Sequence, residues 1–471
     1  ALKIMEIGPK AVLIKGGHAV QTATDVLYNG YEFIVYEEKK MSAAEMAARI
    51  PDASHIFSDI FLAQPKTLYE AINNRCLADS MRSCTITTYL DLYPLVCYTE
   101  PIRFAKNLQG TSVFCSALTR KAVGQGLADY LPNTYWDQPA LIREYLDVDV
   151  FVVSVSPMDS HGYFSLGVTG SDSAEYLKKA KMILVEVNQQ MPYCAEAPKV
   201  HVSEVTALCE ADYALPVLPP AKLDAVSTTI GNLIAEQIPD GACLQLGIGS
   251  IPDAVGMALK SKRHLGIHTE MLTDSMIELI ECGAADNSRK SLHRGKTVTC
   301  FTMGSHALYD FVDDNPTILH KALSYTNDLS VLAANRGMTS INAALQVDLT
   351  GQCASESVGP RQISGSGGQV DTAVGAQMAP GGKSVITLRS TYSAKDPDTG
   401  ERRLQSRILP VLPEGAVVTL TRSNTHFVAT EYGAVCLRGL TVPQRAKALI
   451  SIAHPDFRDW LEEEFHRIYR L

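Results

Sequence analysis

Short apolar runs alternate with amphipathic stretches along most of the chain. The runs are rich in Val, Ile and Leu, which predicts buried strands, and they lie at residues 148–156, 182–187, 384–388 and 416–420. The stretches carry apolar residues at helical spacing, which predicts helices, and they lie at residues 42–50, 252–259 and 444–453. Strands separated by helices indicate an α/β fold with mainly parallel sheets.

One stretch interrupts this alternation. Residues 215–224 contain three prolines, which can continue neither a helix nor a central strand. Since 471 residues exceed what one core usually holds, the stretch predicts a domain boundary. We expect an N-terminal domain at residues 41–218 and a C-terminal domain at residues 224–471. Residues 1–40 form an extension to which no function is assigned.

Composition and charge narrow the classes of protein. Hydrophobic residues make up 46% and charged residues 20%, as in ordinary globular proteins. A net charge of −9, with no Lys/Arg run longer than a pair, argues against nucleic-acid binding. No window reaches the ~18 uninterrupted apolar residues that a bilayer span needs, so no membrane association is expected. A phosphorylated ligand must therefore meet a local basic site.

The cysteines and the first residues bear on location. The 11 cysteines are scattered without a C-x-x-C pair and sit mostly among apolar neighbours, which indicates reduced, buried thiols. The N-terminal residues show neither a long apolar region nor a small-residue cleavage site. We therefore expect a cytoplasmic protein.

A first glycine turn, Gly247-Ile248-Gly249, follows the predicted strand Leu244-Gln-Leu246. Ser250 is the expected N-cap of the helix that comes next, with Pro252 in its first turn. A strand, a tight turn and a helix N-terminus together can accept an anion or an oxyanion. Alternatively, the glycines merely allow a tight turn. The full G-x-G-x-x-G and G-K-[ST] motifs are absent, which disfavours Rossmann or P-loop nucleotide binding.

Glu270 comes 21 residues after Gly249 and three residues after the end of the apolar run of residues 265–267. A carboxylate near backbone amides can act as a nucleophile towards an activated acyl group. A second glycine-rich turn, with Gly365, Gly367 and Gly368, supplies another set of exposed N–H groups. Most glutamates are solvated surface residues, but the end of a strand in an α/β protein is where ligands usually bind. Together these features predict acyl chemistry.

Three other candidates are weaker. His264 and His268 have the i, i+4 spacing of a helical metal pair, but they lie on a predicted strand with no third ligand, so no metal is expected. Glu431, two residues before Gly433, either approaches a ligand or is a buried residue that shapes a turn. Residues 158–164 predict a turn near the site. No G-x-S-x-G motif supports a serine hydrolase.

Several stretches together resemble the acetyl-CoA hydrolase/transferase family, the single-chain class I CoA-transferases that include the 4-hydroxybutyrate and butyryl-CoA:acetate enzymes. The resemblance extends over roughly residues 41 to 460. The stretches that carry it are residues 120–123, 128–130, 155–164, 186–192, 244–255, 265–271, 308–316, 340–352 and 364–371.

The resemblance implies two tandem α/β domains of the CoA-transferase (NagB/RpiA-like) type, with the site in the cleft between them. It also implies a homodimer and no metal. Glu270 would be the nucleophile of a ping-pong reaction through a glutamyl-CoA thioester. Backbone N–H groups near Ile248 and Gly367 would stabilise oxyanions, Glu431 would support the nucleophile, and Lys395 would approach CoA. The substrates would be an acyl-CoA, such as acetyl-CoA or butyryl-CoA, and a small acid similar to 4-hydroxybutyrate.

Two departures from the family pattern concern the acceptor acid. Residues 389–403 form a longer, more cationic stretch than in relatives, and we hypothesise that Arg389 or a neighbour pairs with a second carboxylate or polar tail of the acceptor. Residues 57–65 replace a glycine-rich sequence of relatives, which also fits a shifted acceptor preference. A dicarboxylate acceptor such as itaconate or succinate, a hydrolase that admits water at Glu270, and a non-enzymatic sensor of CoA esters remain alternatives.

Overall fold

The computed structural model describes residues 41–219, 221–395 and 400–469, together with the backbone of three strands before residue 41. Those strands form one antiparallel sheet and are β1 (Val12–Ile14), β2 (Ala23–Tyr28) and β3 (Phe33–Glu38). The rest of the predicted extension at residues 1–40 lies outside the described residues.

The described chain divides into two compact units. Unit 1 comprises the residues up to Leu131, then 140–216 and 312–314. Unit 2 comprises 132–139, 217–311 and the described residues from 315 onward. The chain passes from unit 1 into unit 2 between Pro216 and Val217, within the proline-rich stretch of residues 215–224.

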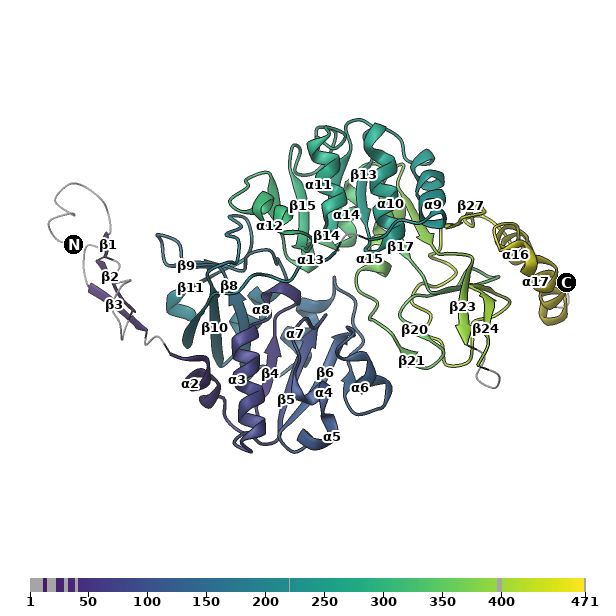
Figure 1. Cartoon of the computed structure of the whole chain (residues 1–471). Helices are drawn as coiled ribbons and strands as arrows, with labels where there is room; N and C mark the ends of the chain where they lie inside the picture. Colours follow the sequence, from purple (N-terminus) through teal and green to yellow (C-terminus); the bar gives the residue numbers. More distant parts are fainter. Residues whose placement is uncertain are drawn as a thin grey trace. The chain divides into compact units, whose positions relative to one another are not determined.

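Unit 1 is built on a parallel sheet of seven strands in the order β12-β10-β8-β4-β5-β6-β7 (Figure 1). Its strands are β4 (His55–Ser58), β5 (Cys84–Tyr89), β6 (Leu108–Phe114), β7 (Asp129–Tyr130), β8 (Val150–Val155), β10 (Met182–Asn188) and β12 (Ala207–Ala211). A small antiparallel pair is formed by β9 (Tyr163–Ser165) and β11 (Lys199–His201). The helices are α2 (Ala43–Ala48), α3 (Lys66–Leu77), α4 (Val96–Thr99), α5 (Pro101–Phe104), α6 (Arg120–Gly124), α7 (Gln138–Tyr145) and α8 (Ser173–Lys179).

The central strand β8 explains why this sheet is apolar throughout. Val150 and Val152 join the core formed with α2 and α3, whereas Phe151 and Val153 join the core formed with α7 and α8. Successive side chains of a strand point to opposite faces, so both faces of the sheet are covered by helices. This explains the continuous rather than alternating apolar run in the sequence.

Unit 2 is built on a sheet of eight strands in the order β16-β15-β14-β13-β17-β22-β26-β27, of which only the last pair is antiparallel. Its strands are β13 (Cys243–Leu246), β14 (Gly266–Leu272), β15 (Thr297–Thr302), β16 (Ile318–His320), β17 (Met338–Ala343), β22 (Lys383–Thr387), β26 (Phe427–Thr430) and β27 (Gly433–Cys436). The helices are α9 (Ala225–Glu236), α10 (Ser250–Ala258), α11 (Asp274–Glu281), α12 (His306–Val312), α13 (Leu323–Thr326), α14 (Leu329–Ala334), α15 (Gln369–Met378), α16 (Val442–Ser451) and α17 (Pro455–Tyr469).

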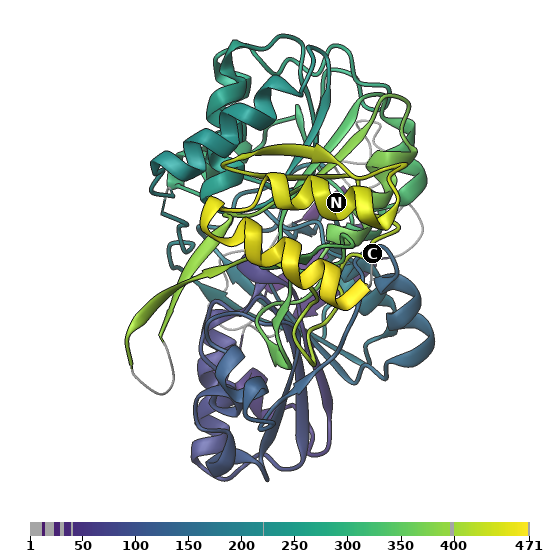
Figure 2. The ribbon, with the colours of Figure 1, turned by 90° about the vertical axis from the view of Figure 1, so that its right-hand side faces the viewer.

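Unit 2 also contains shorter strands outside its main sheet. They are β18 (Gln346–Asp348), β19 (Cys353–Ala354) and β25 (Ile408–Leu409) in one sheet, the pair β20 (Ser357–Val358) and β21 (Arg361–Gln362), and the hairpin of β23 (Thr391–Lys395) and β24 (Arg402–Ser406). Figure 2 shows this yellow-green hairpin extending away from the ribbon, and it shows α16 and α17 side by side. In the described part of the chain, no helix is long and apolar enough to cross a membrane.

Most of the predicted elements are confirmed, and one strand is wrong. The runs at 148–156, 182–187 and 384–388 form β8, β10 and β22, and the three predicted helices form α2, α10 and α16. The run at 416–420 is not a strand, although Leu420 makes one isolated bridge to Cys353. Its Val417 and Val418 are exposed, because the segment follows a turn and runs along the surface. All 11 cysteines are free thiols, and nine of them are buried.

Candidate active site

The two central strands β13 and β14 bring the first glycine turn near Glu270. Cys243 pairs with Gly266 and Leu244 with Ile267 in a parallel ladder. Further along, the Thr269 hydroxyl lies 3.5 Å from the carbonyl of Leu246, so the turn that follows β13 starts near the part of β14 that carries Glu270. In open α/β sheets, ligands bind outside the carboxyl ends of the strands. The two sequence-predicted features therefore lie at the edge of unit 2 where a site is expected.

The first glycine turn presents backbone donors. The N–H of Gly247 donates to the Ile341 carbonyl at 2.9 Å. Among the described residues, the N–H groups of Ile248 and Gly249 donate to no protein acceptor. Gly249 has φ of 112° and is the N-cap of α10, so the prediction that Ser250 caps this helix is wrong. Only glycine adopts this backbone conformation readily, and it makes Ser250 the first helical residue instead.

Glu270 lies inside β14, which continues for two residues beyond it to Leu272, rather than at the strand's end as the sequence predicted. The residue is partly buried. Its Oε2 accepts a hydrogen bond of 3.0 Å from the Asn327 amide. Burial raises the pKa of the carboxyl to about 7, although the Asn327 amide and the Gly368 N–H oppose this shift. The group is therefore a carboxyl poised between its two protonation states near neutral pH.

The second glycine turn meets Glu270 directly. A Cβ on Gly368 would lie 2.0 Å from Oε2 of Glu270 and 1.9 Å from Nδ2 of Asn327, so only glycine fits there. Gly368 is also the N-cap of α15, and the preceding Gly367 has φ of 53°. The start of a helix carries partial positive charge, which favours the ionised carboxylate. Gly365 is buried in the same turn.

Asn327, which the sequence did not single out, connects two carboxyls. Its Nδ2 donates to Glu270 at 3.0 Å and lies 3.4 Å from Oδ2 of Asp371. It follows directly on α13, whose last carbonyl, that of Thr326, accepts a hydrogen bond of 2.9 Å from Nε2 of His268. Burial lowers the pKa of His268 to about 3, so this imidazole is neutral. His268 thus holds in place the turn that positions Asn327.

Asp371 lies in the first turn of α15 and is almost completely buried. Its Oδ2 accepts from the backbone N–H of Trp136 at 3.2 Å. Its Oδ1 has no partner among the described residues. Burial raises the pKa of Asp371 to about 7, and the charge of Glu270 adds to this shift. The sequence motif contains Asp371, but only the fold reveals that its carboxyl shares a donor with Glu270.

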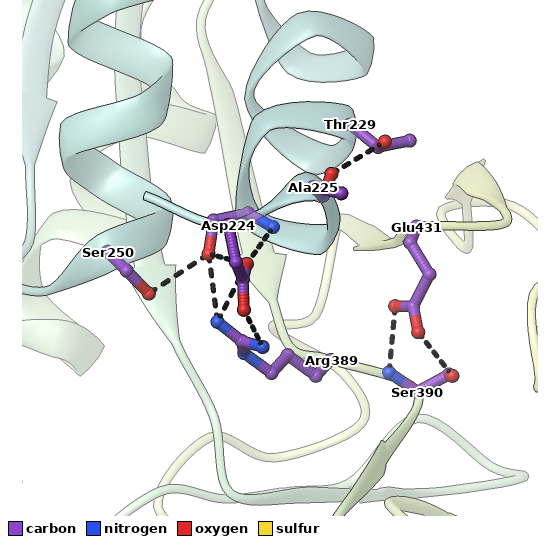
Figure 3. A network of polar contacts seen from close by, with 8 residues as sticks. Asp224, Ala225, Thr229, Ser250, Arg389, Ser390 and Glu431 are labelled. Atoms are coloured by element: carbon purple, nitrogen blue, oxygen red, sulfur yellow. Dashed lines mark hydrogen bonds and ion pairs between the residues drawn. The ribbon is translucent and has the colours of Figure 1, made fainter. Parts of the chain in front are cut away.

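Arg389 and Glu431 belong to a separate polar network (Figure 3). The Arg389 guanidinium donates to both carboxylate oxygens of Asp224, at 2.7 and 3.1 Å, and to Oγ of Ser227 at 2.9 Å. Ser227 in turn donates to Ser250 at 3.1 Å. Arg389 is therefore tied to the beginnings of α9 and α10, and hydrogen bonding to it lowers the pKa of Asp224 well below its usual range.

Glu431 holds the residue after Arg389. Its carboxylate accepts from the backbone N–H of Ser390 at 2.9 Å and from the Ser390 hydroxyl at 2.6 Å. In the described part of the chain, no hydrogen bond joins Glu431 to Glu270. Lys395 is exposed at the end of β23, beside residues that lie outside the described chain.

The two histidines considered for a metal serve other purposes. His264 pairs with Asp286 at 2.8 Å, and His268 is the buried group described above. Within residues 41–219, 221–395 and 400–469, no group of three His, Cys, Asp or Glu side chains is arranged to hold a metal ion.

Tandem α/β units built on parallel sheets define the class of this fold, and comparison with known proteins defines the family. Residues 31–219 match the acetyl-CoA hydrolase/transferase N-terminal domain, and residues 304–465 match the C-terminal domain. The chain therefore belongs to the acetyl-CoA hydrolase/transferase family. This confirms the resemblance, the CoA-transferase type of α/β fold and the expectation of a CoA-transferase enzyme.

Individual relatives span nearly the whole chain. The succinyl-CoA:cyclohexane-1-carboxylate CoA transferase of Geobacter metallireducens is 40% identical, over 93% of this chain and 97% of that protein. The 4-hydroxybutyrate coenzyme A transferase of Clostridium kluyveri is 39% identical, over 92% and 98%. The crystal structure of RipA from Yersinia pestis is 36% identical, with a TM-score of 0.83 over 92% of this chain and 98% of that chain.

Proposed function

We propose that this enzyme moves CoA between an acyl-CoA and a small carboxylic acid, with Glu270 as the nucleophile. The observation that supports this most directly is the place of Glu270, a partly buried residue whose carboxyl lies against Gly368 of the second glycine turn, on the strand next to the one that leads into the first. A carboxylate in that position meets an activated acyl group without any other base, because it already carries the attacking electron pair.

The first half-reaction forms and breaks bonds in two exchanges. The Glu270 carboxylate attacks the thioester carbonyl of the acyl-CoA, and CoA leaves as a thiolate, which gives a mixed anhydride. The thiolate then attacks the glutamyl carbonyl of that anhydride. The donor acid leaves as a carboxylate, and Glu270 carries CoA as a thioester.

The second half-reaction is the reverse with a new acid. The acceptor carboxylate attacks the glutamyl thioester and releases the thiolate, which then attacks the acceptor carbonyl of the second anhydride. The new acyl-CoA leaves and the Glu270 carboxylate is restored. No proton is consumed in the cycle, since both nucleophiles are anions.

Each attack creates an oxyanion that needs hydrogen-bond donors. The free N–H of Ile248 supports the proposal that the first turn supplies one of them. The predicted N–H near Gly367 is the second proposed donor. The N–H of Gly368 and the amide of Asn327 lie against the Glu270 carboxylate in the resting state, and so are assigned to holding it. Removing one such donor typically costs ~100 to 1000-fold in rate.

The acceptor is proposed from the relatives' names. Relatives named for 4-hydroxybutyrate and for butyryl-CoA and acetate favour a small monocarboxylate, with acetyl-CoA or butyryl-CoA as donor. A relative named for succinyl-CoA keeps a dicarboxylate, such as succinate or itaconate, as the second candidate. A contact between Lys395 and CoA, and assembly as a homodimer, stay predictions.

The proposal is tested by trapping the thioester. The protein is mixed with butyryl-CoA without acceptor, treated with hydroxylamine or borohydride, and examined by intact mass and peptide mapping. A CoA adduct, and its hydroxamate or alcohol product, are expected at Glu270 and should be missing from Glu270→Gln. Glu281→Gln, an exposed glutamate on α11, is the matched control and should retain the adduct.

Two results would contradict the mechanism. One is an adduct that persists in Glu270→Gln, which would move the nucleophile elsewhere. The other is acyl-CoA consumption without any adduct and at a rate independent of added acids, which would favour hydrolysis. A screen of acetate, butyrate, 4-hydroxybutyrate, succinate and itaconate as acceptors then ranks the acids.

A further inference from the structure

A pocket lies at the edge of the unit 2 sheet opposite to the edge near Glu270. It has a volume of about 440 Å³ and is formed where the chain enters β13, β17 and β22, at Gly241, Gly337 and Gly381. The loop before β15 contributes Arg289 and Arg294. These four strands are parallel, so their amino ends meet at one edge, away from the glycine turns.

The length of the strands separates this pocket from the candidate active site. Gly247 in the first turn is five residues further along the chain than Ala242 in the pocket, and an extended strand rises about 3.3 Å per residue. The two edges are therefore about 17 Å apart. A ligand in this pocket does not touch Glu270.

The pocket is strongly basic. Arg289, Arg294 and Arg336 line it together with one acid, Asp240, whose Oδ1 already accepts from the backbone N–H of Arg263 at 2.9 Å. Among the described residues, none of the three guanidinium groups makes a hydrogen bond or an ion pair. In a protein of net charge −9, a cluster of three unpaired cations is an exception that requires an explanation.

The loop that carries two of these arginines is fixed in place. The buried Asn287 accepts from the backbone N–H of Ile267 at 2.8 Å and donates to the Thr297 hydroxyl at 3.1 Å. The buried Lys290 donates to the carbonyls of Ile267 and Lys296, at 2.7 and 2.8 Å. These bonds tie the loop to β14 and to the start of β15, so its arginines are presented from a rigid base.

Two contacts join the remaining parts of the pocket. The backbone N–H of Arg336 donates to the Ser291 hydroxyl at 3.1 Å, which links the β17 entrance to the same loop. The stem of Arg289 packs over Gly241, where a Cβ would lie 2.8 Å from its Cδ. The pocket is thus a built feature with arginines converging from separate segments.

Guanidinium groups bind phosphate through paired N–H donors, and three of them exceed what a single phosphate requires. The volume lies in the range of about 300 to 1,000 Å³ typical of small-molecule sites. We propose that this pocket binds a small molecule that carries a diphosphate group, such as a nucleoside diphosphate. The diphosphate lies among the three arginines, and the rest of the molecule fills the remaining volume.

The test is calorimetric titration of the full chain at low ionic strength with ADP, inorganic pyrophosphate and CoA. We expect ADP to bind, and Arg289→Gln or Arg336→Gln to weaken it roughly ten-fold or more, because each removes a charge-assisted hydrogen-bond donor. The double variant should abolish it. These side chains are exposed and unpaired, so the variants should fold normally. Arg49→Gln, an exposed arginine of unit 1, is the control and should bind as the wild type does.

The other probes identify the source of the phosphates. Pyrophosphate binding that matches ADP would assign the affinity to the diphosphate alone, whereas ADP binding without pyrophosphate binding would require the nucleoside as well. Absence of ADP and pyrophosphate binding, or binding unchanged in the double variant, would overturn the proposal. Competition by CoA, with CoA itself weakened in the arginine variants, would also overturn it, since the arginines would then serve the substrate's own phosphates. None of these outcomes depends on whether Glu270 is the nucleophile.

Discussion

Two glutamates occupy matching places in the two units, yet they differ in what surrounds them. Glu186 lies two residues before the end of β10 in unit 1, and Glu270 lies two residues before the end of β14 in unit 2. Each strand is parallel to its neighbours, and burial raises the pKa of each carboxyl. By position and by the direction of the pKa shift, the two are alike.

Their partners separate them. Glu186 is completely buried, and its two oxygens accept from the Tyr213 hydroxyl at 2.6 Å and from the backbone N–H of Leu68 at 2.9 Å. Glu270 is only partly buried, and the free N–H groups of Ile248 and Gly249 lie in the turn that follows the neighbouring strand β13. A raised pKa alone therefore does not mark a nucleophile. What distinguishes the proposed nucleophile is incomplete burial, together with backbone donors on the neighbouring strand that the protein leaves unused.

The largest effect is expected when each of the two glutamates is replaced by glutamine, which has the same shape but no charge. Glu270→Gln removes the proposed nucleophile, so CoA transfer should fall by at least roughly a thousand-fold. Glu186→Gln should leave turnover per folded molecule unchanged. It should lower the free energy of unfolding by roughly 1 to 3 kcal/mol, since one buried donor loses its acceptor. Steady-state kinetics and urea unfolding measure the two quantities. Equal losses of turnover in the two variants would break the comparison.

A smaller but still large effect is expected at the second glycine turn. In Gly368→Ala, the added methyl would occupy the space of Glu270 Oε2 and Asn327 Nδ2 and must push one of them away. A displacement of about 1 Å at a reacting group can cost roughly 100-fold in rate, so kcat should fall by that order. Gly283→Ala is the control. Nothing lies near the Cβ that alanine would add at Gly283, and its φ of 77° is strained for alanine, so this variant should reduce stability without changing kcat.

The sequence predicted the elements of the fold better than the contacts of the site. Apolar runs identified β8, β10 and β22, because a strand buried on both faces needs apolar side chains throughout. The run at 416–420 has the same composition, but Val417 and Val418 stay exposed, and no local signal distinguishes the two cases. Strand propensity depends on a neighbouring strand to pair with, which only the fold decides.

The site shows a similar division. Glu270 and the glycines could be singled out from the sequence because tight turns and the proposed nucleophile restrict the residue type locally. Asn327 was missed, since an asparagine after a short helix looks like an ordinary turn residue, and its role arises only when α13 and α15 meet β14. Arg389 was given a substrate role from its place in an unusual stretch, and its bond to Asp224, 165 residues away, could not be read from that stretch.

The pH dependence sharpens the comparison through Asp371. Glu270 attacks only when ionised, and its pKa of about 7 means that the rate of the first half-reaction should rise from pH 5 to about pH 7 and then level off. The charges of Glu270 and Asp371 oppose each other, and such an interaction is mutual. Asp371→Asn removes one charge, so ionisation of Glu270 becomes easier and the rise should move to lower pH.

The control for this shift is a buried carboxyl of the other unit. Asp91 in unit 1 also has a pKa raised by burial to about 7, but its side chain accepts from the Thr88 hydroxyl, and the charge of Glu270 does not contribute to its shift. Asp91→Asn should leave the profile of kcat/KM for the acyl-CoA in place between pH 5 and pH 9. If both variants shifted the pH profile of kcat/KM equally, the shift would come from a general effect on the fold and not from the interaction between Glu270 and Asp371.

The smallest effect is expected at Arg389. This residue extends the comparison to a cation, since its guanidinium already has partners within the protein. Its guanidinium is engaged by Asp224 and Ser227, and the pair is only partly shielded, with side-chain exposures of 36% and 50%. A pair of this kind contributes about 0 to 1 kcal/mol, so Arg389→Gln should lower the free energy of unfolding by no more than that.

To bind the tail of an acceptor, Arg389 would have to give up Asp224. We therefore expect the ranking of succinate against butyrate as acceptors to be the same in Arg389→Gln and in the wild type. If the ranking of the two acceptors changed while the free energy of unfolding did not, an arginine that already has protein partners would also bind the acceptor. The difference drawn between Glu186 and Glu270 would then not apply to cations.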